Sequence, residues 1–334
     1  MTPRLAKKTI SGWKLLFSGI GRLWSTAKKR RRFAGLSLNR FIFFPERAMF
    51  FGMNSLRLEK ILRDALEEDL GWGDITTEAV VPLEAEARAV IVSREEGVIA
   101  GLEVAEAVFR ILDPSTLVDP LVPEGSAISK EAPLCNIRGR ARAILSGERV
   151  ALNLMQRMCG IATAARNMAM IAEPHHVKVT DTRKTTPGLR MLEKYAVRVG
   201  GGYNHRMALD DAVLIKDNHL VAAGGVSEAV RRARRRIGPL VKIEVETESL
   251  AQVEEALRAG ADVIMLDNME PDRMREAVKL IGGRALVEAS GRIRLDNIHQ
   301  VVTTGIDFLS MGWLTHSAPP LDLSLEFLPG DRLP

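Results

Sequence analysis

The sequence predicts an α/β barrel that follows a compact α+β unit. After Pro174, short apolar strands recur, and amphipathic helical stretches lie between several of them, which is the pattern of repeated βα units. From Lys216 onward, the polar residues that follow these strands are about 21 to 30 residues apart, as expected for one strand and one helix per repeat. From Val80 to Arg140, by contrast, short β-like runs alternate with turns rich in Gly, Pro and acidic residues.

The first unit is predicted to begin with an amphipathic helix from Leu56 to Asp69. Its apolar residues recur at helical spacing, and Gly71 and Gly73 follow it. A long stretch rich in Ala, Met and Leu, from Ser146 to Ala172, is predicted to be a helix that links this unit to the barrel. Between these two helices we predict three strands, Ala87–Val92, Gly97–Ala100 and Pro133–Arg138, and one helix, Leu102–Leu112.

Six strands are predicted for the barrel. Parallel strands need crossover connections and present their carboxyl ends at one mouth, so a barrel explains how residues far apart in the sequence converge. An open doubly wound sheet is the alternative, but no Gly-x-Gly-x-x-Gly run opens a strand–helix turn. The predicted strands are His176–Val179, Ala212–Ile215, Val241–Val245, Val263–Leu266, Ala285–Val287 and Phe308–Ser310, and predicted helices include Ser249–Ala259, Pro271–Ile281 and Asp296–Thr303.

Five basic side chains lie within 34 positions, in segments that do not have the pattern of solvated helix faces. Guanidinium groups bind carboxylates and phosphates through two hydrogen bonds at once, and such charge-assisted bonds are stronger than neutral ones. The sequence therefore predicts a site for a small ligand with several negative charges. The five residues are Arg183, Lys184, His205, Arg206 and Lys216.

Two acids, Glu246 and Asp267, follow later strands of the predicted barrel. Among the cations they could hold Mg²⁺ through water, or stabilise a positively charged transition state. Two plainer interpretations stay open. Glu246 could pair with Lys216 or Lys242, and Asp267 with Asn268 could cap the helix that follows.

The last two predicted strand ends are rich in Gly and Ser. Ser290 and Gly291 follow one of them, and Gly312 and His316 follow the other. Small residues let backbone N–H groups approach an oxyanion, and the late loops of a barrel commonly bind phosphate. We therefore expect the ligand to carry a phosphate at this end and further anionic groups at the other. His219 is expected to be a structural hydrogen-bonding residue rather than a catalyst.

The composition changes near Gly52 and Met53. Residues 1–52 contain twelve Lys or Arg and one acid, Glu46, so this leader carries a net charge of +11 and the remaining 282 residues carry −6. The leader could be an upstream stretch included by a mis-called start, a disordered tail, or a targeting or membrane-binding segment. We rank the targeting or membrane-binding role last. No run approaches the roughly 18 apolar residues that a membrane span needs.

The cysteine content indicates the redox state of the compartment, and the charge and aromatic content indicate which partners to expect. Cys135 and Cys159 lie outside any metal-ligand spacing, and two cysteines form no disulfide framework. We therefore expect a reducing, cytoplasmic compartment. The chain after residue 52 is acidic and has seven aromatic residues to stack on bases, so nucleic acid is not expected as a partner.

Eight motifs in the same order resemble those of the quinolinate phosphoribosyltransferase family, the carboxylating nicotinate-nucleotide pyrophosphorylases. The match runs from about Met53 to Phe327. Because the leader lies outside it, we favour translation that starts at Met53. The motifs are Glu-Asp-Leu-Gly-Trp-Gly-Asp-Ile-Thr-Thr (68–77), Gly-Glu-Arg-Val-Ala-Leu-Asn (147–153), Asp-Thr-Arg-Lys-Thr-Thr-Pro-Gly-Leu-Arg (181–190), Gly-Gly-Gly-Tyr-Asn-His-Arg (200–206), Ile-Lys-Asp-Asn-His (215–219), Met-Leu-Asp-Asn (265–268), Glu-Ala-Ser-Gly (288–291) and Leu-Thr-His-Ser-Ala-Pro (314–319).

The resemblance implies an α/β fold made of an incomplete TIM-like α/β barrel and an N-terminal α+β sandwich domain. The expected boundaries are a leader at 1–52, the sandwich at 53–160, to which 318–334 return, and the barrel at 161–317. The resemblance also implies a homodimer or hexamer, in which the N-terminal domain of one subunit covers the barrel of its neighbour.

The implied reaction transfers phosphoribosyl from 5-phosphoribosyl 1-diphosphate (PRPP) to quinolinate with decarboxylation, in NAD biosynthesis. The resemblance implies Mg²⁺, held by Glu246 and Asp267, and no organic cofactor. Glu244 is the alternative to Glu246 if the motif is aligned differently. The implied roles are catalysis by Lys216, Glu246 and Asp267, quinolinate binding by Arg183, Lys184, His205, Arg206 and, across the subunit interface, Arg149, and phosphate binding by Ser290, Gly291, Gly312 and His316.

Two residues depart from the family pattern. Arg292 stands where a second glycine is usual, and Trp313 stands where a small residue is usual. Arg292 could add charge beside the phosphate, and Trp313 could crowd it. Three other functions stay open: a pyrophosphorylase-like protein associated with molybdate transport, a Schiff-base lyase with Lys216 as nucleophile, and a non-catalytic anion-binding or interaction protein.

Overall fold

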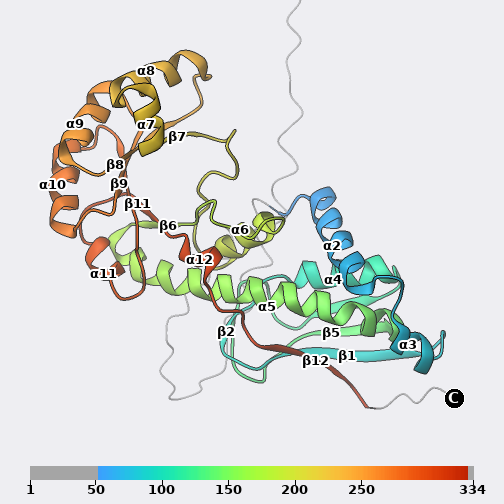
Figure 1. Cartoon of the computed structure of the whole chain (residues 1–334). Helices are drawn as coiled ribbons and strands as arrows, with labels where there is room; N and C mark the ends of the chain where they lie inside the picture. The colour runs from blue at the N-terminus through green and yellow to red at the C-terminus, as the bar shows by residue number, and fades with distance from the viewer. Residues whose placement is uncertain (1–51, 330–334) are drawn as a thin grey trace, which may run out of the picture. The chain divides into compact units, whose positions relative to one another are not determined.

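The computed structural model describes residues 52–329, which form an antiparallel sheet and a parallel sheet, each packed with helices (Figure 1). The expectations for the basic leader and for the last residues, 330–334, lie outside the described residues. Within the described range, no helix combines the length and the apolar character that crossing a bilayer requires.

The antiparallel sheet has the strand order β12-β1-β5-β3. β12, the last strand of the chain, runs antiparallel to β1, with Leu325 opposite Ile91, so the C-terminal segment completes the sheet of the N-terminal part. A second, two-stranded sheet joins β2 and β4. The bounds are α2 (Ser55–Leu70), α3 (Ile75–Val80), β1 (Glu86–Ser93), β2 (Gly97–Val98), α4 (Leu102–Leu112), β3 (Leu117–Pro120), β4 (Ala127–Ile128), β5 (Pro133–Arg140) and β12 (Leu323–Phe327).

Helix α5 (Ala141–Ala172) packs against elements of both parts of the described chain, among them α4, α6, β6 and β12. Buried residues occur on several faces of this 32-residue helix, which explains its lack of a clean amphipathic pattern. The helix starts five residues before the predicted Ser146. The expected boundary between residues 160 and 161 falls inside this continuous helix, so the two parts share a structural element.

The parallel sheet has the strand order β6-β11-β10-β9-β8-β7. The first strand, β6, pairs with the last, β11, which is the order of a barrel and not of a doubly wound sheet, where the order reverses at a switch point. In the described chain β6 and β7 are not neighbours, so the barrel is incomplete. The bounds are β6 (Lys178–Thr180), β7 (Val213–Ile215), β8 (Ile243–Thr247), β9 (Val263–Asp267), β10 (Leu286–Ser290) and β11 (Phe308–Ser310).

The helices of this part lie between the strands in the chain. A short 3-10 turn, η1 (Glu173–His175), precedes β6. α11 is four residues long, shorter than the predicted Asp296–Thr303. The bounds are α6 (Arg190–Val199), α7 (Asp217–Ala223), α8 (Val226–Arg236), α9 (Leu250–Ala259), α10 (Pro271–Ile281), α11 (Ile298–Val301) and α12 (Trp313–His316).

Three strands extend further than their apolar runs predicted. β8, β9 and β10 include Glu246, Asp267 and Ser290, which we expected to follow the strands. The pairing register explains the difference, because Ser290 still pairs with Asp267 and Glu246 with Met265. The polar residues therefore stand on hydrogen-bonded strands, which hold side chains more rigidly than loops do.

Candidate active site

A cavity of about 440 Å³ lies at the carboxyl ends of the parallel strands. Residues from all six parallel strands, or from the segments that follow them, line it. This is the end at which barrels carry their functional residues. The lining residues are Thr182, Arg183, Lys184, His205, Arg206, Leu214, Lys216, Glu246, Met265, Asp267, Asn268, Ser290, Gly291, Arg292 and Ser310.

Nine of the twelve residues predicted from the sequence line this cavity: Arg183, Lys184, His205, Arg206, Lys216, Glu246, Asp267, Ser290 and Gly291. Gly312 and His316 do not line it but lie beside it, since a Cβ at Gly312 would lie 2.8 Å from Lys184 Cδ and 3.2 Å from His316 Cδ2. Arg149 is exposed on α5 and does not line the cavity of its own chain.

The strand pairing explains why these residues converge. Successive side chains of a strand point to opposite faces, so residues two apart share a face. On one face, Lys216, Glu246, Asp267, Ser290 and Ser310 stand at the ends of neighbouring strands. Two residues earlier on each strand, the same face carries a deeper set, Leu214, Glu244, Met265, Glu288 and Phe308.

A buried ion pair holds the two segments that carry the early cations. Lys194 Nζ lies 2.5 Å from Asp181 Oδ1, and both side chains have no solvent exposure. Asp181 also accepts hydrogen bonds from the backbone N–H of His205 at 2.9 Å and from Asn204 Nδ2 at 2.5 Å. Burial raises the pKa of Asp181 and lowers that of Lys194, while their mutual attraction opposes both shifts. The pair thereby joins the segment before Arg183 to the segment before Arg206.

A second polar network holds the Lys184 segment against α12. Arg157 Nε donates to Glu193 Oε1 at 2.7 Å, and Arg157 Nη2 donates to the carbonyl of Thr315 at 2.6 Å. The buried Glu193 carboxylate also accepts from the backbone N–H of Thr186 at 3.1 Å. Thr315 Oγ1 donates to the carbonyl of Lys184 at 2.7 Å. These bonds fix the backbone around Lys184, which suits a site that must present charge in one direction.

The arginines in the cavity retain hydrogen-bonding capacity. Arg183 Nε is buried and makes no hydrogen bond within the described structure. Arg206 Nη1 donates to the carbonyl of Ala212 at 3.0 Å, which leaves its other donors for a ligand. Burial, and then repulsion by Arg183, lower the pKa of Arg206. Two neighbouring guanidinium groups that repel each other are stabilised by a ligand with two negative charges.

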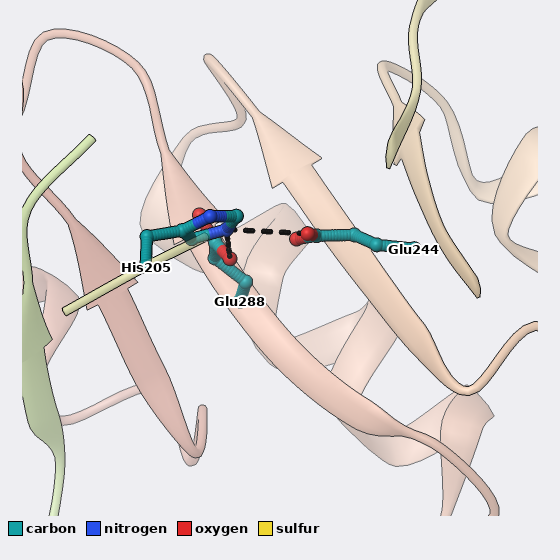
Figure 2. A group of neighbouring side chains, drawn as sticks. All are labelled: His205, Glu244 and Glu288. Carbon is teal, nitrogen blue, oxygen red and sulfur yellow. Dashed lines mark hydrogen bonds and ion pairs between the residues drawn. The ribbon is translucent and has the colours of Figure 1, made fainter. Parts of the chain in front are cut away.

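His205 is bound to two buried acids that the site prediction did not include as site residues. Figure 2 shows its ring directed at Glu288, and at Glu244, which was only an alternative to Glu246. His205 Nε2 lies 3.1 Å from Glu288 Oε2 and 3.2 Å from Glu244 Oε2. Their positions two residues before Ser290 and Glu246 were the available signal, since residues two apart on a strand share a face.

The protonation of this group follows from its contacts. Glu244 and Glu288 are both buried against the same nitrogen of His205, and a buried environment disfavours two charged carboxylates so close together. Burial, together with the charge of Glu244, raises the pKa of Glu288 to about 8. Burial disfavours the charged imidazole of His205, while its bonds to the two acids act in the opposite direction and raise its pKa.

The ring nitrogens of His205 have different partners. The backbone N–H of Arg206 donates to Nδ1 at 2.9 Å, a bond that Nδ1 can accept only without its own proton, so this bond opposes the imidazolium form that the acids favour. We assign the neutral ring with its proton on Nε2, where the acids accept it, because this form satisfies the contacts at both nitrogens. The ligand atoms of His205, Glu244 and Glu288 lie within 4.8 Å of one another. A metal ion could use these atoms, but hydrogen bonding already accounts for the contacts.

The later strands carry the second half of the cavity. Lys216 Nζ lies 2.6 Å from Glu246 Oε2, so the ion pair that we kept as an alternative for Glu246 is present. Asn268 Nδ2 donates to Asp267 Oδ2 at 2.5 Å, and Ser290 and Ser310 are hydrogen-bonded through their hydroxyls at 3.1 Å. The expected structural role of His219 is confirmed, because its Nδ1 accepts from the backbone N–H of Lys216.

Several lining residues were not among the predicted site residues: Thr182, Leu214, Met265, Asn268, Arg292 and Ser310. Arg292 was recognised only as a departure from the family pattern, and it lies in the cavity wall. Trp313, which we expected to crowd the phosphate, does not line the cavity and packs against the hydrophobic core.

Comparisons with known proteins agree with this architecture. Residues 74–159 match the family model of the N-terminal domain of quinolinate phosphoribosyl transferase, and residues 161–326 match that of its C-terminal domain. A probable nicotinate-nucleotide pyrophosphorylase [carboxylating] of Bacillus subtilis is 45% identical over 274 residues, which cover 82% of this chain and 94% of the relative. Quinolinate phosphoribosyltransferase [decarboxylating] 1b of Nicotiana tabacum is 41% identical over 288 residues, covering 80% and 82%.

A solved structure shows the same fold. The crystal structure of NadC from Streptococcus pyogenes superposes with a TM-score of 0.80 at 41% identity, covering 83% of this chain and 99% of NadC. The two family models together span most of the chain, and the two relatives match over 94% and 82% of their own length. The chain therefore belongs to the quinolinate phosphoribosyltransferase family.

Proposed function

We propose that this chain is a decarboxylating quinolinate phosphoribosyltransferase. It transfers phosphoribosyl from PRPP to quinolinate and forms nicotinate mononucleotide, diphosphate and CO₂. The observation that carries this assignment is the division of one cavity into two chemical halves. Arg183, Lys184 and Arg206 supply positive charge from the early strands, and Asp267 and Ser290 supply acid and hydroxyl groups from the later ones.

The half of the cavity that carries Arg183, Lys184 and Arg206 suits a small aromatic dicarboxylate. Quinolinate carries two adjacent carboxylates on a pyridine ring, and two arginines with unused donors can bind them with directional, charge-assisted hydrogen bonds. Arg183 and Arg206 are the primary binding residues, and Lys184 adds charge at the cavity wall. His205 lies alongside, but its two nitrogens are bonded to protein groups, so it shapes the wall instead of donating to a carboxylate.

The later half suits PRPP. Lys216 follows β7, so in chain order it comes after the early cations and before the later acids, and it can neutralise the diphosphate that leaves. Ser290 and Gly291 line the cavity, and Gly312 and His316 lie nearby, beside Lys184. Small residues of this kind let backbone N–H groups approach an oxyanion. This arrangement supports the expected phosphate-binding roles of these four residues.

The reaction follows from the charges. The pyridine nitrogen bonds to the anomeric carbon of PRPP as the bond from that carbon to diphosphate breaks, and the ribose gains positive charge in between. The fixed carboxylates of Asp267 and Glu246 favour that charge. The ring nitrogen is then quaternary. When the bond between C2 and its carboxylate breaks, CO₂ leaves, and the electron pair stays on C2 beside the positive nitrogen until a proton is added.

Glu246 and Asp267 fit a magnesium site. They stand on the neighbouring strands β8 and β9, both line the cavity, and Mg²⁺ prefers one or two carboxylates together with substrate phosphates and water. Bound there, Mg²⁺ would neutralise charge on the diphosphate. Lys216 holds Glu246 in the cavity wall at 2.6 Å, and Asn268 holds Asp267, so the protein orients both acids by itself.

The assembly and the compartment are part of the proposal. A homodimer, or a hexamer of such dimers, would let the exposed Arg149 of one subunit reach the cavity of its neighbour. The reducing cytoplasm is supported by Cys135 and Cys159, which are both free and buried, and burial raises the pKa of each thiol to about 12. The Schiff-base alternative lacks support, since Lys216 is paired with Glu246 and not placed in an apolar pocket that would activate it.

The test is an assay of the purified chain with quinolinate, PRPP and Mg²⁺, followed by chromatography for nicotinate mononucleotide. We expect product with quinolinate and none when PRPP is omitted. Arg183→Ala and Arg206→Ala should each raise the KM for quinolinate by about 10- to 150-fold, because a charged hydrogen bond contributes roughly 1.5–3 kcal/mol. Arg231→Ala on the exposed α8 is the control. Unchanged kinetics in both cavity variants would remove these arginines from the site.

A further inference from the structure

The His205 side chain connects the buried acids of the barrel to the segment that carries Arg206. Its Nε2 lies 3.1 Å from Glu288 Oε2 and 3.2 Å from Glu244 Oε2 (Figure 2). Its Nδ1 accepts the backbone N–H of Arg206 at 2.9 Å. Both ring nitrogens of His205 are therefore hydrogen-bonded to protein groups. Nε2 contacts the acids on the strands, and Nδ1 contacts the backbone of the next residue.

The two acids are well placed to fix this ring. Glu288 is fully buried on β10, and Glu244 is 6% exposed on β8. Strand residues deep in a sheet move little, so an imidazole bonded to two strands has one preferred orientation. The backbone of His205 is held separately by the carboxylate of Asp181 at 2.9 Å. The ring and the main chain of His205 are therefore both fixed before any ligand binds.

Arg206 depends on this arrangement. Its guanidinium is bonded to the carbonyl of Ala212, and its backbone N–H is bonded to His205 Nδ1. If the imidazole turned, the backbone bond would break and the guanidinium would lose its fixed direction. An arginine that binds a carboxylate through two bonds tolerates little misalignment.

We propose that Glu244 and Glu288 are positioning residues for quinolinate, which act through the His205 ring on the orientation of Arg206. This inference rests on the proposed function, because it assigns Arg206 to quinolinate. It concerns neither the PRPP half of the cavity nor the chemical step.

The hydrogen-bonding pattern predicts which substitutions preserve the function. Glu288 Oε2 accepts from His205 Nε2. A glutamine amide oxygen can accept the same bond, so Glu288→Gln keeps this contact without a carboxylate. Glu288→Met keeps the length of the side chain and fills the same apolar volume, but accepts no such bond.

The experiment measures kcat and both KM values for the wild type and four variants: Glu288→Met, Glu288→Gln, His205→Phe and the double variant Glu288→Met/His205→Phe. We expect Glu288→Met to raise the KM for quinolinate at least about tenfold, the effect of losing one such hydrogen bond, and to leave the KM for PRPP within about twofold. Glu288→Gln should have a KM for quinolinate much closer to that of the wild type than Glu288→Met has. In the double variant, Glu288→Met should raise the KM for quinolinate little beyond that of His205→Phe alone, because the effects of residues that act through one another are not additive.

Glu124→Met is the matched control. Glu124 is another buried acid whose pKa burial raises, and it accepts from the backbone N–H groups of Gly101 and Leu102 at the start of α4. Its replacement should lower the thermal stability and leave both KM values unchanged. Three results would overturn the inference: an unchanged quinolinate KM in Glu288→Met, no rescue by Glu288→Gln, or full additivity in the double variant.

A nitrogen-15 NMR spectrum of the His205 ring separates failure of this inference from failure of the proposed function. The wild type should show a protonated Nε2, which persists in Glu288→Gln. If the wild type forms no nicotinate mononucleotide, the proposed function fails, and the spectrum still reports whether the acids hold the ring. If the wild type is active and Nε2 is not protonated, the inference alone fails. The spectrum of Glu288→Gln also provides a test if Glu288→Met does not fold.

Discussion

Gly291 and Arg292 stand together in the cavity wall with left-handed backbones, at φ values of 92° and 52°. Gly291 adopts this conformation without strain, and a Cβ there would lie 2.4 Å from Asn268 Oδ1. Arg292 adopts it at a cost of about 1–2 kcal/mol. Among the lining residues that the described strands β9 to β11 and their loops contribute, Arg292 is the one cation. We infer that the strain is retained because its guanidinium contacts the phosphates of PRPP.

Arg292→Gly should separate stability from binding. Removing the side chain relieves the strain, so the melting temperature should stay equal or rise, while the KM for PRPP should rise about tenfold with the loss of one charged contact. Calorimetry and steady-state kinetics measure the two effects. His176→Gly, at an exposed residue with φ of 58° outside the cavity, should relieve similar strain and leave the KM unchanged. A PRPP KM that stays at the wild-type value in Arg292→Gly would show that the guanidinium is dispensable.

Glu288 should make the folded state less stable as the pH rises. Its pKa is about 8 in the folded protein, raised by burial from the ordinary 4.5. Between these values the folded state keeps a proton that the unfolded state has lost, so the free energy of unfolding falls with pH across this window. Urea denaturation at pH 5 and pH 8 should show a larger decrease for the wild type than for Glu288→Gln, which cannot titrate. Equal decreases in both proteins would mean that Glu288 is ionised in the fold at neutral pH.

Helix α5 shows why one element can stabilise both sheets. It runs from Ala141 to Ala172, and the chain that leads to β12 crosses it closely. At Gly160, a Cβ would lie 1.9 Å from the carbonyl oxygen of Pro319. Glycine in mid-helix costs roughly 1 kcal/mol relative to alanine, so its presence reflects this close approach and not helix propensity.

Gly160→Ala should therefore destabilise the protein, although alanine is the better helix former. We expect a net loss of about 1–3 kcal/mol in the free energy of unfolding, the usual effect of overpacking, measured by urea denaturation. Gly238→Ala is the control, because no heavy atom lies within 4 Å of its added Cβ, and it should change stability by less than about 0.5 kcal/mol. If Gly160→Ala proved as stable as Gly238→Ala, the close packing of α5 against Pro319 would be refuted.

The sequence predicted the barrel and most of the cavity because both depend on local patterns. Apolar runs followed by polar residues marked the strands, and motif residues such as Arg183 and Asp267 lie together as expected. Buried partners were harder to predict. Lys194 lies in α6 among charged neighbours and has the local pattern of a surface residue, yet it is fully buried against Asp181. Such a pairing is set by tertiary contacts, which no short stretch of sequence records.

Arg149 links the single chain to its assembly. It is exposed on α5 and does not line the cavity of its own chain. In the proposed dimer, it lines the cavity of the neighbouring subunit. At quinolinate concentrations below the wild-type KM, Arg149→Ala and Arg183→Ala should each be nearly inactive alone. When the two variants are unfolded and refolded together, about half of the dimers combine one subunit of each variant. One of the two sites in such a mixed dimer has both native arginines and the other has neither, so about a quarter of the wild-type activity should return. Activity no higher than the sum of the two variants would contradict a shared site.

In the proposed reaction, this one cavity couples phosphoribosyl transfer to the loss of a specific carboxylate. The most direct measurement follows carbon-14 in quinolinate labelled at either the 2- or the 3-carboxylate. We predict that the 2-label leaves as CO₂ only when PRPP and Mg²⁺ are present, and that the 3-label stays in nicotinate mononucleotide. Release of label without PRPP, or release from the 3-position, would contradict this coupling, because the quaternary nitrogen formed by transfer would then not drive decarboxylation.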